Sequence, residues 1–223
     1  MKKIIIILVF LSQLASISPP ANAQVFEVNA SSQISDYTIS VAPGRITLID
    51  FGTKLRSQPW LVNNKLARIY SLNNKKNNTS ILAVQGLSDS GSCDLTADTE
   101  AGLFNIQIVA RPSPGADLII DEDRSSIIDN KNLFQINSNR TALIKLSSKI
   151  DEFVLAGDPE LLKCRPIFDF YDSRFLKSFA LSGLNTLGKT DLVIATEKGI
   201  IKFEIEVNTN ENQHNNIIDF SDY

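Results

Sequence analysis

The chain has 223 residues, of which 43% are hydrophobic, with 22 basic and 25 acidic side chains and a formal net charge of −3. This acidic balance disfavours a nucleic-acid-binding role, because such proteins usually present a basic face that releases counterions from phosphates. The only histidine, His214, lies in a polar segment near the C-terminus. Ser-His-Asp catalysis in a folded site is therefore excluded.

The first 23 residues have the pattern of a secretory signal peptide. Lys2 and Lys3 precede the apolar run 4–11, and Ala21-Asn22-Ala23 supplies a small-residue cleavage site. The alternative, a membrane anchor, needs about 18 to 20 apolar residues, and this run is shorter. We expect cleavage after Ala23, export to the periplasm of a bacterial envelope, and no membrane span in the mature chain. Removal of the two lysines leaves 20 basic against 25 acidic residues, a net charge of −5.

Residues 24–111 are expected to form a first small β domain. A polar lead-in at 24–36 reads as an arm or an extra edge strand. Apolar residues then alternate over 37–41, which predicts a strand. Pro43-Gly44 predicts a turn into a second strand at 46–51.

The middle of this domain is less regular. The stretch 54–72 fits neither the helical nor the strand period, and we interpret it as a turn or short helix followed by a strand. Residues 73–78, Asn-Asn-Lys-Lys-Asn-Asn, are typical of a polar hairpin tip rather than of a basic patch. The strand 80–84 returns from this tip, and a hairpin over 86–108 closes the domain.

Pro112-Ser113-Pro114-Gly115 gives the clearest boundary signal, because two prolines and a glycine resist regular structure. We expect a linker at 112–131 and two domains that unfold separately. Within the linker, Asp121-Glu122-Asp123 could hold a metal. However, the spacing of a calcium loop is lacking, so a solvated acidic segment is favoured and no metal is expected.

Residues 132–207 are expected to form a second β domain. It contains the turn Gly157-Asp158-Pro159-Glu160 and a hairpin whose strands begin with the apolar run 192–196. An aromatic cluster is interpreted as ordinary core rather than as a binding groove; its members are Phe168, Phe170, Tyr171, Phe175 and Phe179.

The Asn-rich segment 208–223 cannot bury a core, so it is expected to be a disordered tail. Its apolar residues could nevertheless dock on a partner as an added strand. These residues are Ile217, Ile218, Phe220 and Tyr223.

The second domain repeats the pattern of the first, at a spacing of 97 residues in the hairpin and 95 residues upstream of it. Matched positions include Asp94 with Asp191, Leu95 with Leu192, Thr99 with Thr196, Gly102 with Gly199 and, upstream, Arg45 with Arg140. Several of these are turn residues and not merely hydrophobic, which indicates a tandem duplication. The predicted fold is therefore all-β, with two tandem small antiparallel β-sandwich-like domains. The residues expected to shape its turns are Gly91, Gly102, Gly157, Asp158, Pro159, Gly188 and Gly199.

Cys93 and Cys164 are the only two cysteines. An oxidising compartment would favour a disulfide between them. However, they occupy non-equivalent places in the two repeats, so such a bond would link the domains rather than staple each one. Two free thiols are slightly favoured.

The sequence contains no phosphate loop, zinc-spaced cysteine pair, dinucleotide fingerprint or G-x-S-x-G elbow. A glycosidase could use two carboxylates, but no local pattern singles out a pair. We therefore expect no cofactor and no enzymatic activity.

Residues 142–207 resemble the N-terminal domain of pilus-assembly secretins, the outer-membrane ring proteins of tight-adherence pilus and type II-like systems. The resemblance rests on the strand at 143–146, the Gly-Asp-Pro-Glu turn at 157–160, and Gly183 through Gly188 and Thr190 leading into the last hairpin. The first repeat lacks this turn, and no channel domain follows. The resemblance implies a free-standing periplasmic relative rather than a pore. The first domain has a weaker similarity to periplasmic core-complex subunits of type IV secretion.

These observations predict a periplasmic assembly or scaffold component of a pilus or secretion apparatus that docks other envelope proteins or copies of itself. Small β-sandwiches expose edge strands, which either are blunted or add a strand from a partner. The alternative is an exported module that binds a small ligand or a surface polysaccharide, which would show exposed aromatic side chains along a groove.

Overall fold

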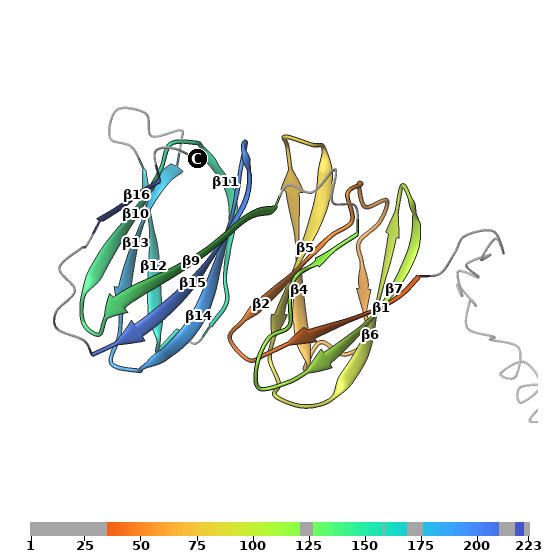
Figure 1. Ribbon diagram of the computed structural model, residues 1–223, viewed down its shortest axis with the longest axis horizontal. Coiled ribbons are helices and arrows are strands. Elements are labelled where there is room, and N and C mark those ends of the chain that lie inside the picture. The colour runs from red at the N-terminus through yellow and green to blue at the C-terminus, as the bar shows by residue number, and fades with distance from the viewer. Residues whose placement is uncertain (1–34, 121–126, 158, 169–175, 210–216, 221–223) are drawn as a thin grey trace, which may run out of the picture. The chain divides into compact units, whose positions relative to one another are not determined.

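The computed structural model describes residues 35–120, 127–157, 159–168, 176–209 and 217–220. These residues form sixteen β-strands and no helix (Figure 1). The strands of the first domain are β1 (Ser35–Val41), β2 (Ile46–Asp50), β3 (Trp60–Leu61), β4 (Ala67–Asn74), β5 (Thr79–Gly86), β6 (Ser92–Thr99), β7 (Gly102–Ala110) and β8 (Leu118–Ile119). Those of the second domain are β9 (Ile127–Asn137), β10 (Thr141–Leu146), β11 (Ile150–Leu155), β12 (Leu162–Phe168), β13 (Leu176–Gly183), β14 (Gly188–Thr196), β15 (Gly199–Asn208) and β16 (Ile217–Phe220).

Each domain consists of two four-stranded sheets. Sheet A has the order β1-β7-β6-β3 and sheet B the order β4-β5-β2-β8; in the second domain, sheet C is β11-β14-β15-β9 and sheet D is β12-β13-β10-β16. Most neighbouring strands are antiparallel, while β1 with β7, β2 with β8, β9 with β15 and β10 with β16 are parallel. The predicted fold class, two tandem all-β sandwich-like domains, is confirmed.

Each sandwich encloses its own apolar core. In the first domain, Leu95 of β6 and Ile106 of β7 belong to a buried cluster shared by sheets A and B. In the second, Leu192 of β14 and Phe203 of β15 belong to the cluster shared by sheets C and D. Burial alternates along β6, since every second side chain faces this core and the next faces away from it.

The duplication extends to the pairing register. Leu95 pairs with Ile106 as Leu192 pairs with Phe203. The turn chemistry is also duplicated. Thr99 Oγ1 donates to the carbonyl oxygen of Gly102 at 2.9 Å, and the corresponding bond from Thr196 Oγ1 to Gly199 measures 3.0 Å.

The connection from β1 to β2 is a four-residue turn that recurs between β9 and β10. The amide nitrogens of Arg45 and Arg140 each donate to the carbonyl oxygen three residues earlier, at 3.1 and 3.0 Å. The residues before these arginines have positive φ, 68° at Gly44 and 59° at Asn139. Glycine and asparagine are the residues that adopt this conformation most readily, so both repeats keep the same turn with different residues.

A glycine at the end of β5 and of β13 lets this turn approach the sheet. A Cβ at Gly86 would clash with the backbone of Ala42, and one at Gly183 would be 2.8 Å from the carbonyl oxygen of Asn137. The two glycines are equivalent in the repeat, and so are the residues that they contact. Larger residues would push the turn away in either domain.

The expected linker at 112–131 differs from the structure, because it contains the strand β8 and the start of β9. β8, at Leu118–Ile119, pairs with Ile49 and Asp50 of β2. β9 begins at Ile127 and pairs with β15. The prolines do end β7, but the chain then returns to its own domain before it leaves. The acidic residues 121–123 lie outside the described residues.

The expected disordered tail at 208–223 also contains a strand. β16 pairs in parallel with β10, with Ile217 opposite Leu143 and Phe220 opposite Leu146. The strand that contains Ile217, Ile218 and Phe220 is therefore already paired within sheet D of its own chain, where the prediction had it docking on a partner. β16 occupies the place in sheet D that β8 has in sheet B. Tyr223 lies outside the described residues.

Deleting residues 209–223 is expected to destabilise the second domain, because the deletion uncovers the backbone of β10. Each of the few backbone hydrogen bonds lost contributes about 0.5 to 1.5 kcal/mol, so the total should be about 2 kcal/mol. At roughly 2 to 4 °C per kcal/mol for a chain of this size, the midpoint of thermal unfolding should fall by several degrees. Circular dichroism on heating measures it, with deletion of 221–223 as the control. An unchanged midpoint would show that β16 adds nothing.

Candidate functional site

The two domains meet through an apolar surface. Gln33–Tyr223 forms one compact unit. Side chains on the outer faces of sheets B and C form a third buried cluster, which both domains share. Its members are Ile46, Leu48, Leu72, Ile81 and Ala83 from the first domain and Val154, Ala156, Val193, Ala195 and Ile200 from the second. Sheets B and C are thus covered on both faces, and the domains are not independent.

An ion-pair network lies at the edge of this junction. Arg45 Nε donates to Asp191 Oδ1 at 3.0 Å, and Arg45 Nη2 donates to Glu204 Oε2 at 2.8 Å. The second oxygen of Asp191 accepts the backbone N–H of Ile46 at 2.7 Å. Lys189 Nζ donates to the other oxygen of Glu204 at 2.8 Å. The fully buried Asp191 side chain is therefore bonded to the first domain through both oxygens.

These contacts favour the charged forms of the network. Burial opposes the charge on Arg45, but hydrogen bonds and attraction from Asp191 and Glu204 outweigh it, so the pKa of Arg45 lies above its ordinary value. The pKa of Glu204 lies below its ordinary value, chiefly because of the hydrogen bond from Lys189. A carboxyl with a lowered pKa stabilises the folded state at neutral pH, and this contribution is lost as the pH falls through that pKa.

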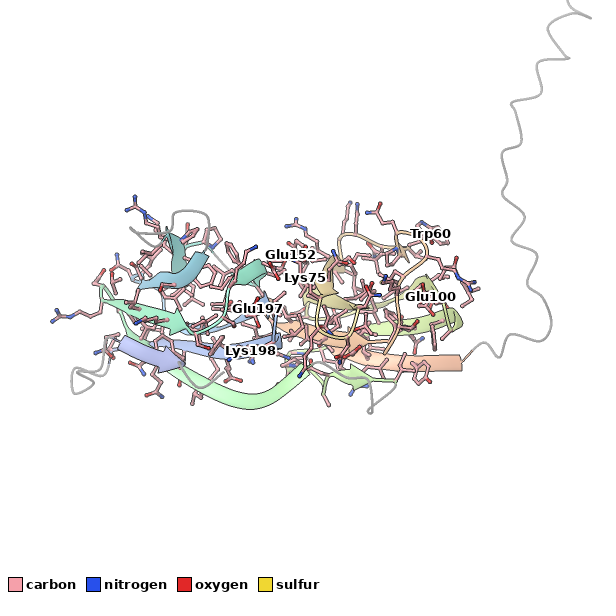
Figure 2. The ribbon with its side chains drawn as sticks, turned by 90° about the horizontal axis from the view of Figure 1, so that it is seen from above. Trp60, Lys75, Glu100, Glu152, Glu197 and Lys198 are labelled. Atoms are coloured by element: carbon pink, nitrogen blue, oxygen red, sulfur yellow. The ribbon has the colours of Figure 1, made fainter. Side chains whose placement is uncertain are left out.

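Two further ion pairs cross the junction. Asp117, just before β8, accepts Lys202 Nζ from the second domain at 2.8 Å and the N–H of Leu48 at 2.7 Å. Lys75, at the tip of the β4–β5 hairpin, donates to Asp151 at 2.7 Å. The hairpin tip is thus a polar contact between domains, and Lys75 is labelled in Figure 2.

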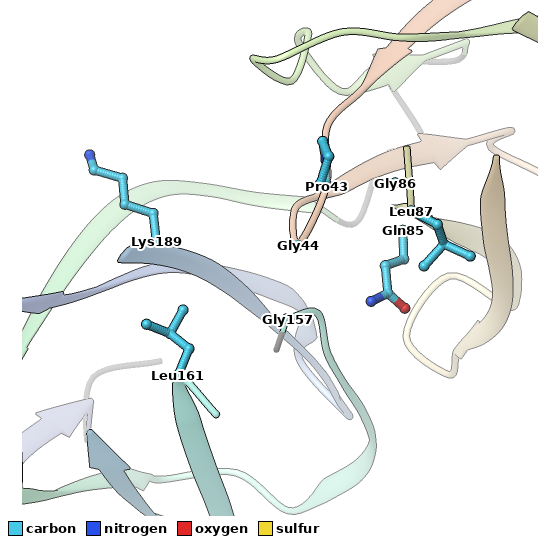
Figure 3. Close-up of a pocket in the computed structure, with 8 residues that line it drawn as sticks. All are labelled: Pro43, Gly44, Gln85, Gly86, Leu87, Gly157, Leu161 and Lys189. Atoms are coloured by element: carbon cyan, nitrogen blue, oxygen red, sulfur yellow. The ribbon is translucent and has the colours of Figure 1, made fainter. Parts of the chain in front are cut away.

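A cleft of about 320 Å³ opens beside the junction (Figure 3). The first domain contributes the Pro43-Gly44 turn and residues 85–87, and the second contributes Gly157, Leu161 and Lys189. The side-chain carbonyl oxygen of Gln85 accepts the hydroxyl of Tyr70 at 3.1 Å, and Lys189 is bonded to Glu204. The cleft is therefore lined by three glycines and the apolar side chains of Pro43, Leu87 and Leu161, and its two long polar side chains are already bonded.

Gly157 lines this cleft, and glycine is needed there because a Cβ would clash with the side chain of Thr190. Its φ is 137°, which also favours glycine. Thr190 Oγ1 is buried without a hydrogen-bond partner among the described residues. Over the same residues, no group of three or more His, Cys, Asp or Glu side chains could hold a metal ion.

A second candidate surface lies on the outer face of sheet A. Trp60 of β3, which is labelled in Figure 2, is 68% exposed. Val62, directly after β3, is 56% exposed. Leu61 between them packs against the core. Large exposed tryptophans are the side chains that most often carry binding energy in protein interfaces.

The structure distributes the predicted turn residues along the edges of both sandwiches and does not gather them into one site. Gly91, Gly102 and Gly199 have positive φ, at 107°, 137° and 140°. Gly188 instead begins β14 and pairs with Val207. Pro159 is exposed in the turn before β12, and Asp158 lies outside the described residues.

Cys93 and Cys164 are both free thiols, so the structure forms no bond between them. Cys93 belongs to the core of the first domain and Cys164 packs against the core of the second. Burial raises the pKa of Cys164 to about 11 and is the main cause of the raised pKa of Cys93. Both thiols therefore remain protonated and unreactive near neutral pH.

The sequence interpretation missed the Arg45, Asp191 and Glu204 network. In the sequence, Arg45 and Asp191 stand out only as matched positions of the repeat. An ion pair between residues that are 146 positions apart leaves no local sequence pattern from which it could be predicted. Trp60 lay in the stretch that fitted neither period. The exposure of Trp60 depends on its register opposite Thr96 of β6.

Within the described part of the chain, the structure contains no helix long and apolar enough to cross a membrane. No protein-family model matches the sequence, and no curated protein sequence matches it.

Several solved structures show a distant similarity in shape. Domains 5 and 6 of the S-layer protein SbsC match over 79% of this chain and 96% of that one, with 12% identity and a TM-score of 0.29. An endo-fucoidan hydrolase of glycoside hydrolase family 107 matches over 79% and 33%, with 11% identity and a TM-score of 0.27. Tandem Ig domains of titin match over 85% and 95%, with 10% identity and a TM-score of 0.22. None of the three is a secretin domain, and scores this low support no argument about function.

Proposed function

We propose that this chain is a non-catalytic, exported component of a pilus or secretion apparatus that acts by docking other proteins. The observation that carries the proposal is the exposed pair Trp60 and Val62 on a domain whose position is fixed by the junction. An apolar anchor on a rigid support loses little conformational entropy on binding, which favours a stable contact. The signal-peptide pattern and the secretin resemblance supply the setting.

The end strands of the sheets give such a component a second means of contact wherever they are not blunted or covered. β1 is the end strand of sheet A, and β4 and β12 are end strands of sheets B and D. β12 contains Pro166, a residue that sheets tolerate at an edge, where its missing N–H costs no ladder bond. Sheet edges either are blunted in this way or accept a strand from a partner.

Site-specific photo-crosslinking in cells tests the proposal. A photoreactive amino acid at position 60 is expected to capture an envelope protein of a secretion or pilus system, and the same residue at exposed Leu187 serves as the control. The variant Trp60→Ala should then weaken binding of the purified pair by about thirtyfold or more, since a hot-spot residue contributes at least about 2 kcal/mol. Capture of the same proteins at both positions, or of none, would contradict the proposal.

The alternative function, binding of a small ligand or a surface polysaccharide, is supported by the cleft beside the junction. Its volume of about 320 Å³ lies at the lower end of the range for ligand pockets. The bonded state of Gln85 and Lys189 makes it the weaker candidate. Calorimetry of the purified protein with envelope oligosaccharides decides between them. Binding that is lost in Leu87→Arg, a change at a 38% exposed position of the cleft, with no protein captured at position 60, would favour the ligand.

A further inference from the structure

The junction between the domains joins unlike faces. Sheet B of the first domain packs against sheet C of the second. The duplication makes sheet D equivalent to sheet B, and sheet A equivalent to sheet C. Sheets D and A are therefore the two faces at which the same junction could be repeated. A contact between unlike faces can add copies without closing, whereas a contact between like faces stops at a dimer.

The charged pair of the junction recurs on these two faces. Arg140 occupies the place of Arg45, because each closes the same turn at the start of an equivalent strand. Asp94 occupies the place of Asp191, because each lies in the same register of its hairpin. Arg140 and Asp94 are both exposed. The two faces thus keep complementary charges at the positions that bond inside the molecule.

An apolar anchor recurs as well. Trp60 lies opposite Thr96, and Val154 lies opposite Val193, the repeat equivalent of Thr96. Trp60 is therefore the equivalent of Val154, a residue that the junction buries. Val154 is 7% exposed and Trp60 is 68% exposed.

On sheet D, Ile167 lies opposite Ser178 as Leu72 lies opposite Ile81. Leu72 is 2% exposed and Ile167 is 40% exposed. Each end face therefore presents an exposed large apolar side chain at a position where the junction buries its equivalent.

Other positions on the end faces are more polar than their equivalents in the junction. Sheet A has Thr96 and Asp98 where sheet C has Val193 and Ala195. Sheet D has Ser178 where sheet B has Ile81. These exchanges remove apolar area from the contact, so it should be reversible rather than permanent.

We propose that sheet D of one copy docks on sheet A of a second copy, head to tail, with Arg140 facing Asp94 of the second copy and Trp60 of the second copy covered by sheet D. This inference rests on the proposed docking function and names a second copy of this chain as the partner. The contact repeats the internal junction in weaker form.

The test uses sedimentation velocity and the fluorescence of Trp60, the only tryptophan in the chain. As the purified protein is concentrated, its sedimentation coefficient should rise past that of a dimer. The Trp60 emission should move to shorter wavelength, because the ring leaves water. A protein that stays monomeric with unchanged emission, or that stops at a dimer, would overturn the inference.

Charge reversal identifies the faces. Arg140→Asp and Asp94→Arg should each weaken association by about tenfold or more, because each places like charges together. An equimolar mixture of the two variants should associate again, since every contact between one variant and the other pairs opposite charges, and the two then alternate along the assembly. Lys198→Asp, in the β14–β15 turn, is the matched control and should associate like the unaltered protein. Variants that associate normally, or a mixture that does not recover, would contradict the head-to-tail contact.

Crosslinking at position 60 separates this inference from the proposed function. Capture of a second copy supports both. Capture of a different envelope protein by a chain that stays monomeric overturns the inference and leaves the docking function standing. Capture of nothing overturns both.

Discussion

Replacing Asp191 with alanine is expected to destabilise the protein by about 3 to 5 kcal/mol, the usual cost of removing one partner of a buried ion pair. The change leaves Arg45 with Glu204 alone and the N–H of Ile46 without its acceptor. Asp191→Asn should cost less, because its side-chain oxygen can still accept that N–H. Urea unfolding followed by circular dichroism measures both, since Trp60 is already too exposed to report unfolding well.

The duplication provides a matched control for this experiment. Asp94 is the repeat equivalent of Asp191 but is exposed. Asp94→Ala should therefore change the free energy of unfolding by no more than about 0.5 kcal/mol, as surface substitutions usually do. Equal losses for the two variants would mean that Asp191 contributes through its strand and not through the junction.

Replacing Phe203 with alanine is expected to cost about 3 to 5 kcal/mol, because it empties a fully buried position in the core of the second domain. Both domains should then unfold together in one transition at lower urea concentration. The sequence alone predicts separate unfolding, since the prolines at 112–115 suggest a free joint. The cluster shared by sheets B and C changes that expectation, because loss of sheet C uncovers the apolar face of sheet B.

Domain-specific probes measure this coupling. Hydrogen exchange read by mass spectrometry should show the strands of both domains losing protection together in Phe203→Ala. Leu187→Ala, at an exposed loop position, is the control and should change stability by no more than about 0.5 kcal/mol. Protection that persists in the first domain alone would show that the shared cluster contributes little.

The sequence predicts the sandwich class and the duplication well, because both depend on local pattern. Alternation along 201–207 and the paired Thr and Gly positions suffice for the hairpins and their register. The sequence also contains a pattern that indicates the junction between the domains. The runs 81–84 and 192–195 are apolar without alternation, which is typical of strands buried on both faces. A second buried face implies a covering partner.

The rest of the fold and the candidate site depend on long-range contacts that local pattern does not contain. β8 and β16 are short and polar in context, and they form strands only because β2 and β10 offer a free edge. Arg45 is an ordinary surface arginine by sequence, and only the packing of sheet B on sheet C places it beside Asp191.

The parallel pairing of the first and last long strands in each domain has a mechanical consequence. β1 enters the first domain beside β7, and β9 enters the second beside β15. If a force pulls on the N-terminal end of one strand and on the C-terminal end of its parallel neighbour, the two strands are sheared along their length. The whole ladder between them then bears the load at once, instead of opening one bond at a time. The short β8 and β16 would detach first, and the long pairs would resist. A chain stretched from its two ends would therefore yield at its connections while its sandwiches remain folded.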